Sequence, residues 1–292
     1  MMALAREKVT LSTDYLLFPE TAIPEPHWEH EVEYLYATEQ IRLLIDSFPN
    51  LKTVIGSLSS RLFLPGEELT SAAKPFKDGN GFYENYNDAI FIDSSENTEM
   101  HIKSKLVLGV EKVPFISSIP FLKKLSINLG GTSGGYGTTD SPTLFYSKTG
   151  SSVLAPIICY ESIYGEYVTE YSRKGANIFA IITNDGWWDD SPGYHQHLAY
   201  ARLRAIENRR AIVRSANTGI SAVIDQKGEI LDQTEWWVPA VISAKVSLSD
   251  QQTFYVQYGD FIGRVMSFVA PLMILLTLVK SLNKTGQRLS TK

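Results

Sequence analysis

Short apolar runs alternate with stretches of helical periodicity over the first 225 residues. The runs are rich in Val, Ile, Leu and Phe, a composition typical of strands that are covered on both faces. They predict strands at 15–18, 53–58, 89–92, 153–159, 178–183, 211–215 and 221–225. Between them, apolar spacing predicts helices at 30–48, 162–174 and 194–208, and "MMALAREKVT" predicts a short helix entering the first strand. This alternation predicts an α/β domain with helices packed on sheets.

The stretch 112–150 departs from this alternation. It holds the amphipathic "PFISSIPFLKKL" and then the glycine-rich "LGGTSGGYGTTDSPT". The glycine-rich part lacks the G-K-[ST] ending of a phosphate loop, so we interpret it as a flexible loop. The amphipathic part fits two interpretations, a lid or lipid-contacting loop, or a surface loop with a few buried anchors.

The pattern changes again after Asp260, where positions 265–279 form an unbroken uncharged run. A membrane-spanning helix needs about 20 mostly apolar residues. Arg264 could extend to the interface, and Pro271 is tolerated in such helices. The alternative is a buried core helix; because the run is apolar on all faces, an interfacial amphipathic helix fits less well. We therefore expect a catalytic domain at 1–258, a transmembrane helix at 261–281 and a basic cytoplasmic tail at 282–292.

Composition adds few restrictions on function. The chain has 292 residues, a net charge of −5 and a sequence pI near 5.6. It therefore offers no basic surface that would indicate a nucleic-acid partner. A single cysteine excludes an internal disulfide and a multi-cysteine metal site. The N-terminus has no apolar region of the kind found in a signal peptide.

The single cysteine, Cys159, stands in "PIICYES" at the end of a predicted strand. A lone cysteine there is most often a packing residue. A reactive residue at a strand-to-helix turn, however, would lie near a helix N-terminus, which favours a thiolate. A catalytic cysteine also needs a base and an oxyanion stabiliser. Glu20 in "FPETAIP" and Lys103 in "KSKLVLG" could fill these roles, although each alone could equally be a surface residue.

Other conspicuous residues have ordinary interpretations. His195 and His197 lie at i, i+2 and face different sides of a helix, so we expect them to shape the helix start rather than to bind metal. Trp187 and Trp188 fit packing or membrane contact. The basic run is expected to pair with Glu207, Asp225 and other acids; it comprises Arg202, Arg204, Arg209, Arg210 and Arg214.

Glu20, Lys103 and Cys159, taken in order, resemble the Glu–Lys–Cys triad of the nitrilase, or carbon–nitrogen hydrolase, superfamily. Within it, the surrounding motifs resemble the apolipoprotein N-acyltransferase family. These motifs are "FPETAIP", "KSKLVLGVEKVPF", "PIICYES", "TNDGWWDDSPGYHQHLAYARLRAIENRRAIVRSANTGISAVIDQKGEI" and "TFYVQYGD", together with the apolar helix that follows. The resemblance runs from about residue 11 to 279. It implies a nitrilase-like α-β-β-α sandwich followed by one C-terminal transmembrane helix.

The resemblance also implies residue roles. Cys159 would carry an acyl chain from a phospholipid donor as a thioester, with Glu20 as general base and Lys103 stabilising the oxyanion. The acyl acceptor would be the N-terminal amine of a diacylglyceryl-cysteine apolipoprotein. Supporting site residues would be Glu111, Tyr160, Glu161 and Trp187. No cofactor, metal or nucleic acid is implied. The protein would lie in a bacterial inner membrane, with its catalytic domain on the periplasmic side.

The chain departs from the family pattern at its start. The family carries membrane helices ahead of the catalytic domain, and that domain opens with a strand before its first helix, whereas "MMALAREKVT" begins inside that helix. Two alternatives therefore stay open beside the acyltransferase. One is an amidase of the same superfamily, and the other is a truncated, non-catalytic remnant tethered to the membrane.

Overall fold

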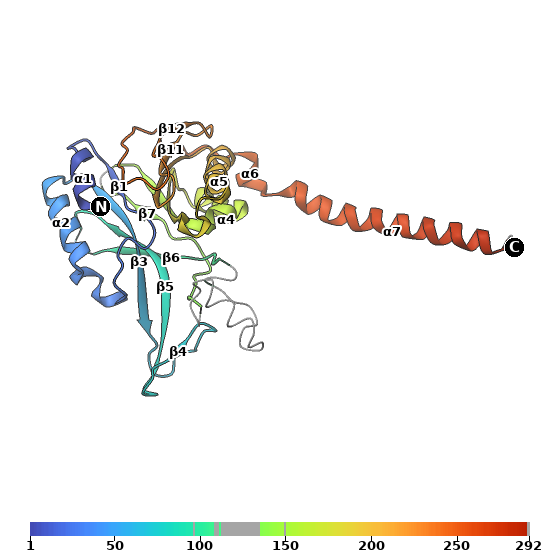
Figure 1. The fold of residues 1–292 in the computed structure, drawn as a ribbon, viewed down its shortest axis with the longest axis horizontal. Coiled ribbons are helices and arrows are strands. Elements are labelled where there is room, and N and C mark those ends of the chain that lie inside the picture. Colours follow the sequence, from blue (N-terminus) through green and yellow to red (C-terminus); the bar gives the residue numbers. More distant parts are fainter. Residues whose placement is uncertain (96, 108–110, 112–134, 149, 291–292) are drawn as a thin grey trace.

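The computed structural model describes residues 1–95, 97–107, 111, 135–148 and 150–290, with the side chains of the last helix described as far as residue 280. Two six-stranded sheets form the centre of the molecule. Figure 1 shows α1 and α2 on one side of the strands and α4 and α5 on the other. The α-β-β-α sandwich expected from the sequence is confirmed.

The first sheet has the order β1-β3-β5-β4, with β2 beside β3 and β6 beside β5. Its strands are β1 (Tyr15–Leu17), β2 (His27–Trp28), β3 (Lys52–Leu62), β4 (Lys74–Pro75), β5 (Phe82–Ile92) and β6 (Glu99–Ile102). β1 pairs with β3 in parallel, whereas β3 and β5 form an antiparallel pair from Thr53↔Ile92 to Leu62↔Tyr83. The predicted strands at 53–58 and 89–92 are the inner halves of this long pair, which projects from the domain (Figure 1).

The second sheet has the order β12-β11-β10-β9-β8-β7. Its strands are β7 (Phe145–Tyr146), β8 (Val153–Ile158), β9 (Ile178–Asn184), β10 (Ala211–Asn217), β11 (Ala222–Ile224) and β12 (Ile230–Gln233). The central strands β8, β9 and β10 are parallel to one another. Their carboxyl ends therefore lie along one edge, which is where sites in α/β sheets collect.

The helices and 3₁₀ turns are α1 (Met2–Lys8), η1 (Glu29–Tyr34), α2 (Tyr36–Ser47), η3 (Cys159–Ile163), α4 (Gly165–Arg173), η4 (Asp185–Trp188), α5 (Gly193–Asn208), α6 (Phe254–Tyr258) and α7 (Phe261–Ser290). The single helix predicted at 30–48 is wrong, because Leu35 is extended and separates η1 from α2. The helix predicted from Ser162 begins only at Gly165, because η3 and an extended Tyr164 precede it.

Period-two alternation in the strands divides the core into layers. In β9, Ile178, Ala180 and Ile182 pack with Val54 and Phe91 of the first sheet. The alternate residues Phe179 and Ile181 pack with residues of α4 and α5 on the outer face. α1 and α2 cover the outer face of the first sheet in the same way. Both faces of β9 are therefore apolar, which explains its continuous hydrophobic run.

α7 extends away from the domain into open space (Figure 1). Its segment Phe261–Lys280 is long and apolar enough to cross a membrane, and none of it is buried against the rest of the molecule. The alternative of a buried core helix is therefore wrong. Of the atypical stretch 112–150, the amphipathic "PFISSIPFLKKL" lies outside the described residues, so its role stays a prediction. The short strand β7 lies within this stretch.

Candidate active site

Glu20 lies just beyond β1, where the chain crosses closely over β3. Its neighbour Thr21 has φ +52°, and a Cβ added at Gly56 of β3 would lie only 2.6 Å from the Glu20 Cα. Only glycine at position 56 leaves room for this crossing. The Gly56 N–H donates to Pro19 O at 3.1 Å, which fixes the turn and directs the Glu20 side chain into the protein. Glu20 is 3% exposed.

Lys103 is buried between two carboxylates. Its Nζ donates to Glu20 Oε1 at 2.9 Å and to Glu111 Oε1 at 2.8 Å. Burial disfavours the ammonium, but the charges of Glu20, Cys159 and Glu111 outweigh that effect and raise the pKa of Lys103 above its ordinary value. Among the described residues, two of its three N–H bonds are used, so the third is available to a substrate oxygen.

Asn87 of β5 was not singled out from the sequence, yet it holds the two carboxylates together. Its Nδ2 donates to Glu20 Oε1 at 2.8 Å and to Glu111 Oε1 at 2.9 Å. The other oxygen of Glu20 accepts from the backbone N–H of Asn184 at 2.8 Å. Both carboxylates are therefore held in place by several donors beside one lysine.

Cys159 is the first residue of η3, at the carboxyl end of β8. It has φ +50°, a left-handed conformation that is unusual for any residue with a side chain. Its side chain is buried, and burial, followed by the Glu20 charge, raises the pKa of the thiol to about 12, against the lowering effect of Lys103 and a hydrogen bond with Thr183. This raised pKa favours the neutral thiol rather than the thiolate expected at a helix N-terminus. η3 is a five-residue 3₁₀ turn with a small dipole, and burial favours the neutral thiol.

The carbonyl of Cys159 is held by a buried network that the sequence did not reveal. The Ser162 hydroxyl donates to Cys159 O at 2.7 Å, and His197 Nε2 lies 3.1 Å from the same oxygen. His197 Nδ1 lies 2.8 Å from Asp185 Oδ1, and Arg214 Nη2 is 2.7 Å from Asp185 Oδ2. Burial would raise the pKa of Asp185, but the hydrogen bond from His197 and the charge of Arg214 lower it overall. The network therefore holds the turn that carries the cysteine.

Glu161 is fully buried and accepts four hydrogen bonds. The backbone N–H groups of Ser104 and Ile158 donate to it at 2.6 and 2.8 Å. Tyr167 donates at 3.0 Å, and His101 Nε2 lies 3.3 Å away. Burial raises the pKa of Glu161, but the His101 charge and these bonds outweigh it and lower the pKa below its ordinary value. Because Ser104 follows Lys103, Glu161 ties the lysine segment to the cysteine turn.

The two aromatic site residues expected from the sequence lie in different surroundings. Tyr160 is half-buried against the core between the sheets, edge-on to Tyr164 with ring centroids 5.7 Å apart. Trp187 is 58% exposed in η4, two residues after Asp185. Among the described residues, Trp187 forms no hydrogen bond or ring contact with Glu20, Lys103 or Cys159, so its place at the site stays a prediction. Trp188 lies over Gly193, where an added Cβ would meet its ring at 2.6 Å.

The histidine and arginine interpretations need correction. His195 is exposed and lies at the helix start, but His197 belongs to the cysteine network.

Arg204 pairs with Glu207 at 3.0 Å, as expected. Asp225 pairs with none of the arginines. It accepts backbone N–H groups of its own turn, whereas Arg202, Arg209 and Arg210 donate to backbone carbonyls. Within the described part of the chain, no group of three or more His, Cys, Asp or Glu side chains could hold a metal ion.

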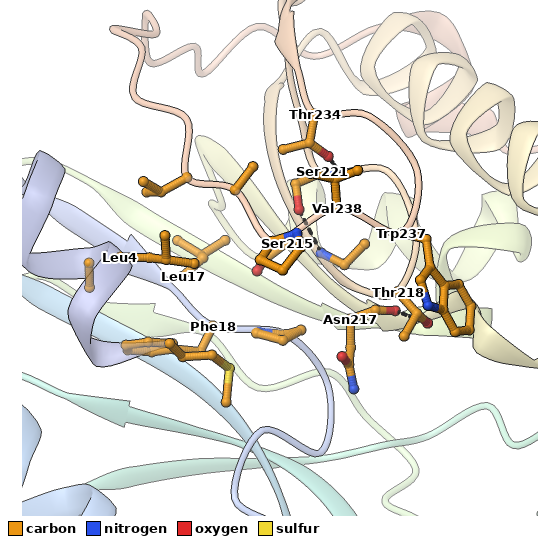
Figure 2. A pocket seen from close by; sticks show the side chains of 18 of the residues that line it. Leu4, Leu17, Phe18, Ser215, Asn217, Thr218, Ser221, Thr234, Trp237 and Val238 are labelled. Atoms are coloured by element: carbon orange, nitrogen blue, oxygen red, sulfur yellow. Dashed lines mark hydrogen bonds between the residues drawn. The ribbon is translucent and has the colours of Figure 1, made fainter.

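A cavity of about 400 Å³ lies beside the site, between α1, β1, the end of β10 and the segment 237–241. Figure 2 shows Leu4, Leu17 and Phe18 at one end of it, and Asn217 and Thr218 at the other. Its lining includes Pro19, which precedes Glu20, and Thr218, whose hydroxyl donates to Asn184 Oδ1 at 3.3 Å. The cavity therefore adjoins the turns that carry Glu20 and Asn184.

The sequence is similar to a known family and to several known proteins. Residues 1–255 match the family model described as carbon-nitrogen hydrolase. Three curated relatives are named apolipoprotein N-acyltransferase. The one from Chlorobaculum tepidum is 36% identical over 201 residues, 68% of this chain and 38% of that relative. The one from Allorhizobium ampelinum is 30% identical over 240 residues, 81% and 40%. The Treponema pallidum relative, "Apolipoprotein N-acyltransferase 1", is 28% identical over 274 residues, 90% and 47%. The chain thus spans less than half the length of each.

Solved structures with this fold include Nesterenkonia AN1 amidase from the nitrilase superfamily. A cysteine-to-serine mutant of that amidase superposes with a TM-score of 0.52 at 14% identity, covering 88% of this chain and 83% of that chain. A cysteine-to-alanine mutant gives 0.50 at 14% identity, covering 82% and 79%. At this identity the likeness supports the fold alone.

Proposed function

The chain belongs to the carbon–nitrogen hydrolase family, as its motifs predict, and from that membership we propose that it is an acyltransferase of the apolipoprotein N-acyltransferase type. The relatives named above supply the reaction, and the Glu20–Lys103–Cys159 site supplies the groups that it needs. The observation that carries the proposal is the buried thiol of Cys159, whose pKa responds to both Glu20 and Lys103. The carboxylate of Glu20 and the ammonium of Lys103 therefore both act electrostatically on the single cysteine.

The first half-reaction would load the cysteine. Because the thiol is neutral in the resting site, Glu20 takes its proton as the sulfur attacks the ester carbonyl of a phospholipid. The carbonyl oxygen gains the negative charge, and the free N–H of Lys103 donates to it; one such donor is worth about 3–4 kcal/mol. The C–O bond then breaks, Glu20 returns its proton to the leaving alkoxide, and a lysophospholipid departs from the acyl thioester.

The second half-reaction would release the acyl chain to an amine. The uncharged N-terminal amine of a diacylglyceryl-cysteine apolipoprotein attacks the thioester carbonyl, and Glu20 accepts the proton that the nitrogen loses. The C–S bond breaks, the sulfur regains a proton from Glu20, and an amide is formed. Throughout, Glu111 and Asn87 keep Lys103 and Glu20 in place. A site closed to water favours this transfer over hydrolysis.

We place the protein in a bacterial inner membrane, with a catalytic domain at 1–258, a transmembrane helix at 261–281 and a basic tail at 282–292. The exposed apolar segment Phe261–Lys280 supports the membrane location. The basic residues Lys284, Arg288 and Lys292 follow it, and such flanks stay on the cytoplasmic side. The catalytic domain would then face the periplasm.

A labelling experiment tests the function. The membrane-bound chain is incubated with phospholipid that carries a radiolabelled acyl chain, and the protein-bound label is treated with neutral hydroxylamine, which cleaves thioesters. We expect a hydroxylamine-sensitive label in the wild type and none in Cys159→Ala. A label of equal size in Cys159→Ala would refute the thioester. A wild-type chain that hydrolyses a small amide but takes no label would be an amidase, and one that does neither would be a non-catalytic remnant.

A further inference from the structure

A second pocket, of about 230 Å³, lies where α7 leaves the domain. It is formed by α4, by the end of α6 and by the first turn of α7. The residues that matter here are Glu166, Glu170, Arg173, Tyr258, Gly259 and Arg264. None of these six residues forms a hydrogen bond or ion pair with Glu20, Lys103 or Cys159. The pocket is therefore a candidate site of its own.

Close packing builds one wall of this pocket. Glu166 Oε1 accepts from the Asp260 N–H at 2.7 Å and pairs with Arg264 Nη2 at 3.0 Å. A Cβ added at Gly259, which has φ +66°, would lie 2.4 Å from Glu166 Oε1 and 2.5 Å from Arg264 Nη2. The ion pair thus passes directly over a glycine backbone, and any side chain at position 259 would displace it.

The facing wall has unused hydrogen-bonding capacity. Glu166, Glu170 and Arg173 follow one another at i, i+4 and i+7, so they share one face of α4. Within the described part of the chain, the carboxylate of Glu170 forms no hydrogen bond or ion pair. Arg173 donates from Nη1 to Val256 O at 2.8 Å, and its other side-chain N–H groups have no partner among the described residues. A carboxylate and a guanidinium therefore remain available to a ligand in the pocket.

The position of the pocket at the start of α7 indicates which layer of a membrane it would face. The apolar segment begins at Phe261, and the Arg264 guanidinium extends back to Tyr258 O and to Glu166, so the charged end of this side chain lies at the level where the segment starts. The polar headgroup layer of a bilayer is about 5–8 Å thick on each side. Phe254, Tyr258 and Phe261 form an exposed aromatic cluster there, with Phe254 ring centroids 4.5 and 5.2 Å from the other two. Aromatic side chains favour this level of a membrane.

We propose that this pocket binds the head group of a phospholipid that carries both a phosphate and a primary ammonium. Two acids and two arginines make its formal charge zero, which suits a zwitterion better than an anionic lipid. The arginines would donate to the phosphate oxygens. The ammonium, with three N–H donors, would bind the Glu170 carboxylate, which a quaternary trimethylammonium cannot do through hydrogen bonds.

This inference rests on insertion of α7 in a membrane, which is part of the proposed function, but it does not depend on thioester chemistry. The test uses the full chain in neutral detergent micelles. Equal amounts of phosphatidylethanolamine, phosphatidylcholine and phosphatidylglycerol with identical acyl chains are added, and bound lipids are counted by native mass spectrometry. We expect the phosphatidylethanolamine adduct to exceed each of the others at least fivefold.

Variants then locate the site. Glu170→Gln should lower the phosphatidylethanolamine adduct at least fivefold and leave the phosphatidylglycerol adduct unchanged. Arg173→Gln should lower the adducts of all three lipids. Gly259→Ala, which alters no charge, should lower the phosphatidylethanolamine adduct by displacing the Glu166–Arg264 pair. Matched controls are Glu39→Gln and Arg6→Gln, which remove the same charges from exposed positions on α2 and α1. Circular dichroism spectra like that of the wild type establish that each variant is folded.

Several results would overturn the inference. These are equal adducts of the three lipids in the wild type, a preference for phosphatidylglycerol, or losses in the controls as large as in Glu170→Gln. Competition by inorganic phosphate as effective as competition by O-phosphoethanolamine would make the pocket a plain anion site. The adduct should persist in Cys159→Ala, and its loss there would place the lipid in the reactive site instead. If the adduct persists while the wild type takes no acyl label, only the proposed function fails.

Discussion

Two sets of paired acids and bases in this protein differ in how far water reaches them. At the candidate active site, the side chains of Lys103 and Glu20 are 1% and 4% exposed, and Glu20 accepts three hydrogen bonds. At the base of α7, the side chains of Arg264 and Glu166 are 59% and 52% exposed, and the Glu170 carboxylate beside them has no hydrogen-bond or ion-pair partner among the described residues. Buried charges must be satisfied by the protein itself. Exposed charges can rely on water, which leaves them free to exchange it for a ligand.

The same difference explains why the two sets depend on their neighbours to different degrees. Burying an ion pair costs several kcal/mol per ion, so removing one partner leaves an uncompensated charge worth about 3–5 kcal/mol. An exposed pair contributes about 0–1 kcal/mol. The predictions below test whether burial, rather than the kind of residue, sets these magnitudes.

Lys103→Met should have the largest effect. It removes the cation between Glu20 and Glu111 and leaves two buried carboxylates facing each other. We expect a loss of about 3–5 kcal/mol in the free energy of unfolding, measured by urea denaturation in detergent, and no detectable acyl label. Lys245→Met, at an exposed position, is the control. A loss below about 1 kcal/mol would mean that the buried pair is no different from the exposed one.

Asp185→Asn should rank second. It removes the carboxylate that faces the buried Arg214, so we expect a loss of about 3 kcal/mol at pH 7. The pKa of Asp185 is lower in the folded protein than its ordinary 3.8. Its contribution to the free energy of unfolding is therefore fully present above pH 3.8 and is lost as the pH falls through the lower, folded pKa.

The wild type should therefore lose more stability between pH 5 and pH 3 than Asp185→Asn does. Urea titrations at these two pH values measure the difference. Asp190→Asn, an exposed neighbour, should behave like the wild type. If the wild type and Asp185→Asn lost the same free energy of unfolding between pH 5 and pH 3, the assignment of a buried, ionised Asp185 would be contradicted.

A smaller effect is expected from Cys159 at high pH. The pKa of the thiol is raised from 9.0 to about 12 in the folded protein. Its contribution to the free energy of unfolding is therefore fully present below pH 9 and is lost as the pH rises from 9 towards 12. At pH 10 the unfolded chain would already have released the proton, which favours unfolding by about 1 kcal/mol. The wild type should lose that much more stability than Cys159→Ala between pH 8 and pH 10. Equal losses would show a thiol with an ordinary pKa.

Arg264→Gln should change stability least. Its partner Glu166 is more than half exposed and keeps the Asp260 N–H as a second partner, so we expect a change below about 1 kcal/mol in urea denaturation. High salt should abolish even that change, because exposed pairs are screened. A loss as large as that of Lys103→Met would break the comparison.

The strands that could be predicted were those with long apolar runs. β8 and the first five residues of β9 were found because both their faces are buried, which leaves no polar interruption there, and β10 was found from its opening apolar residues Ala211, Ile212 and Val213. β2, β4 and β7 were missed, since each has two residues and exists only because a longer strand pairs with it. The helix at 30–48 was predicted unbroken because apolar spacing continues across Leu35, although the backbone there is extended.

At the candidate site, motifs identified Glu20, Lys103 and Cys159, and the structure brings Glu20 and Lys103 into direct contact. Asn87 and the Asn184 N–H were missed because an asparagine within or at the end of a strand carries no local signal. His197 was visible in "HQH", but its role depends on Asp185, which begins the η4 turn directly after β9.

By itself, the sequence determined the alternation of strands and helices, the order of the motifs and the apolar segment at the C-terminus, because each of these is a local pattern. Only the tertiary structure decided which groups meet. Glu20 and Lys103 are 83 positions apart, and Glu20 and Asn184 are 164 apart. It also decided the state of Cys159, because burial, which no local pattern reports, raises the pKa of the thiol. The chemistry of a charged group depends on its distance from water and from other charges, and folding sets both.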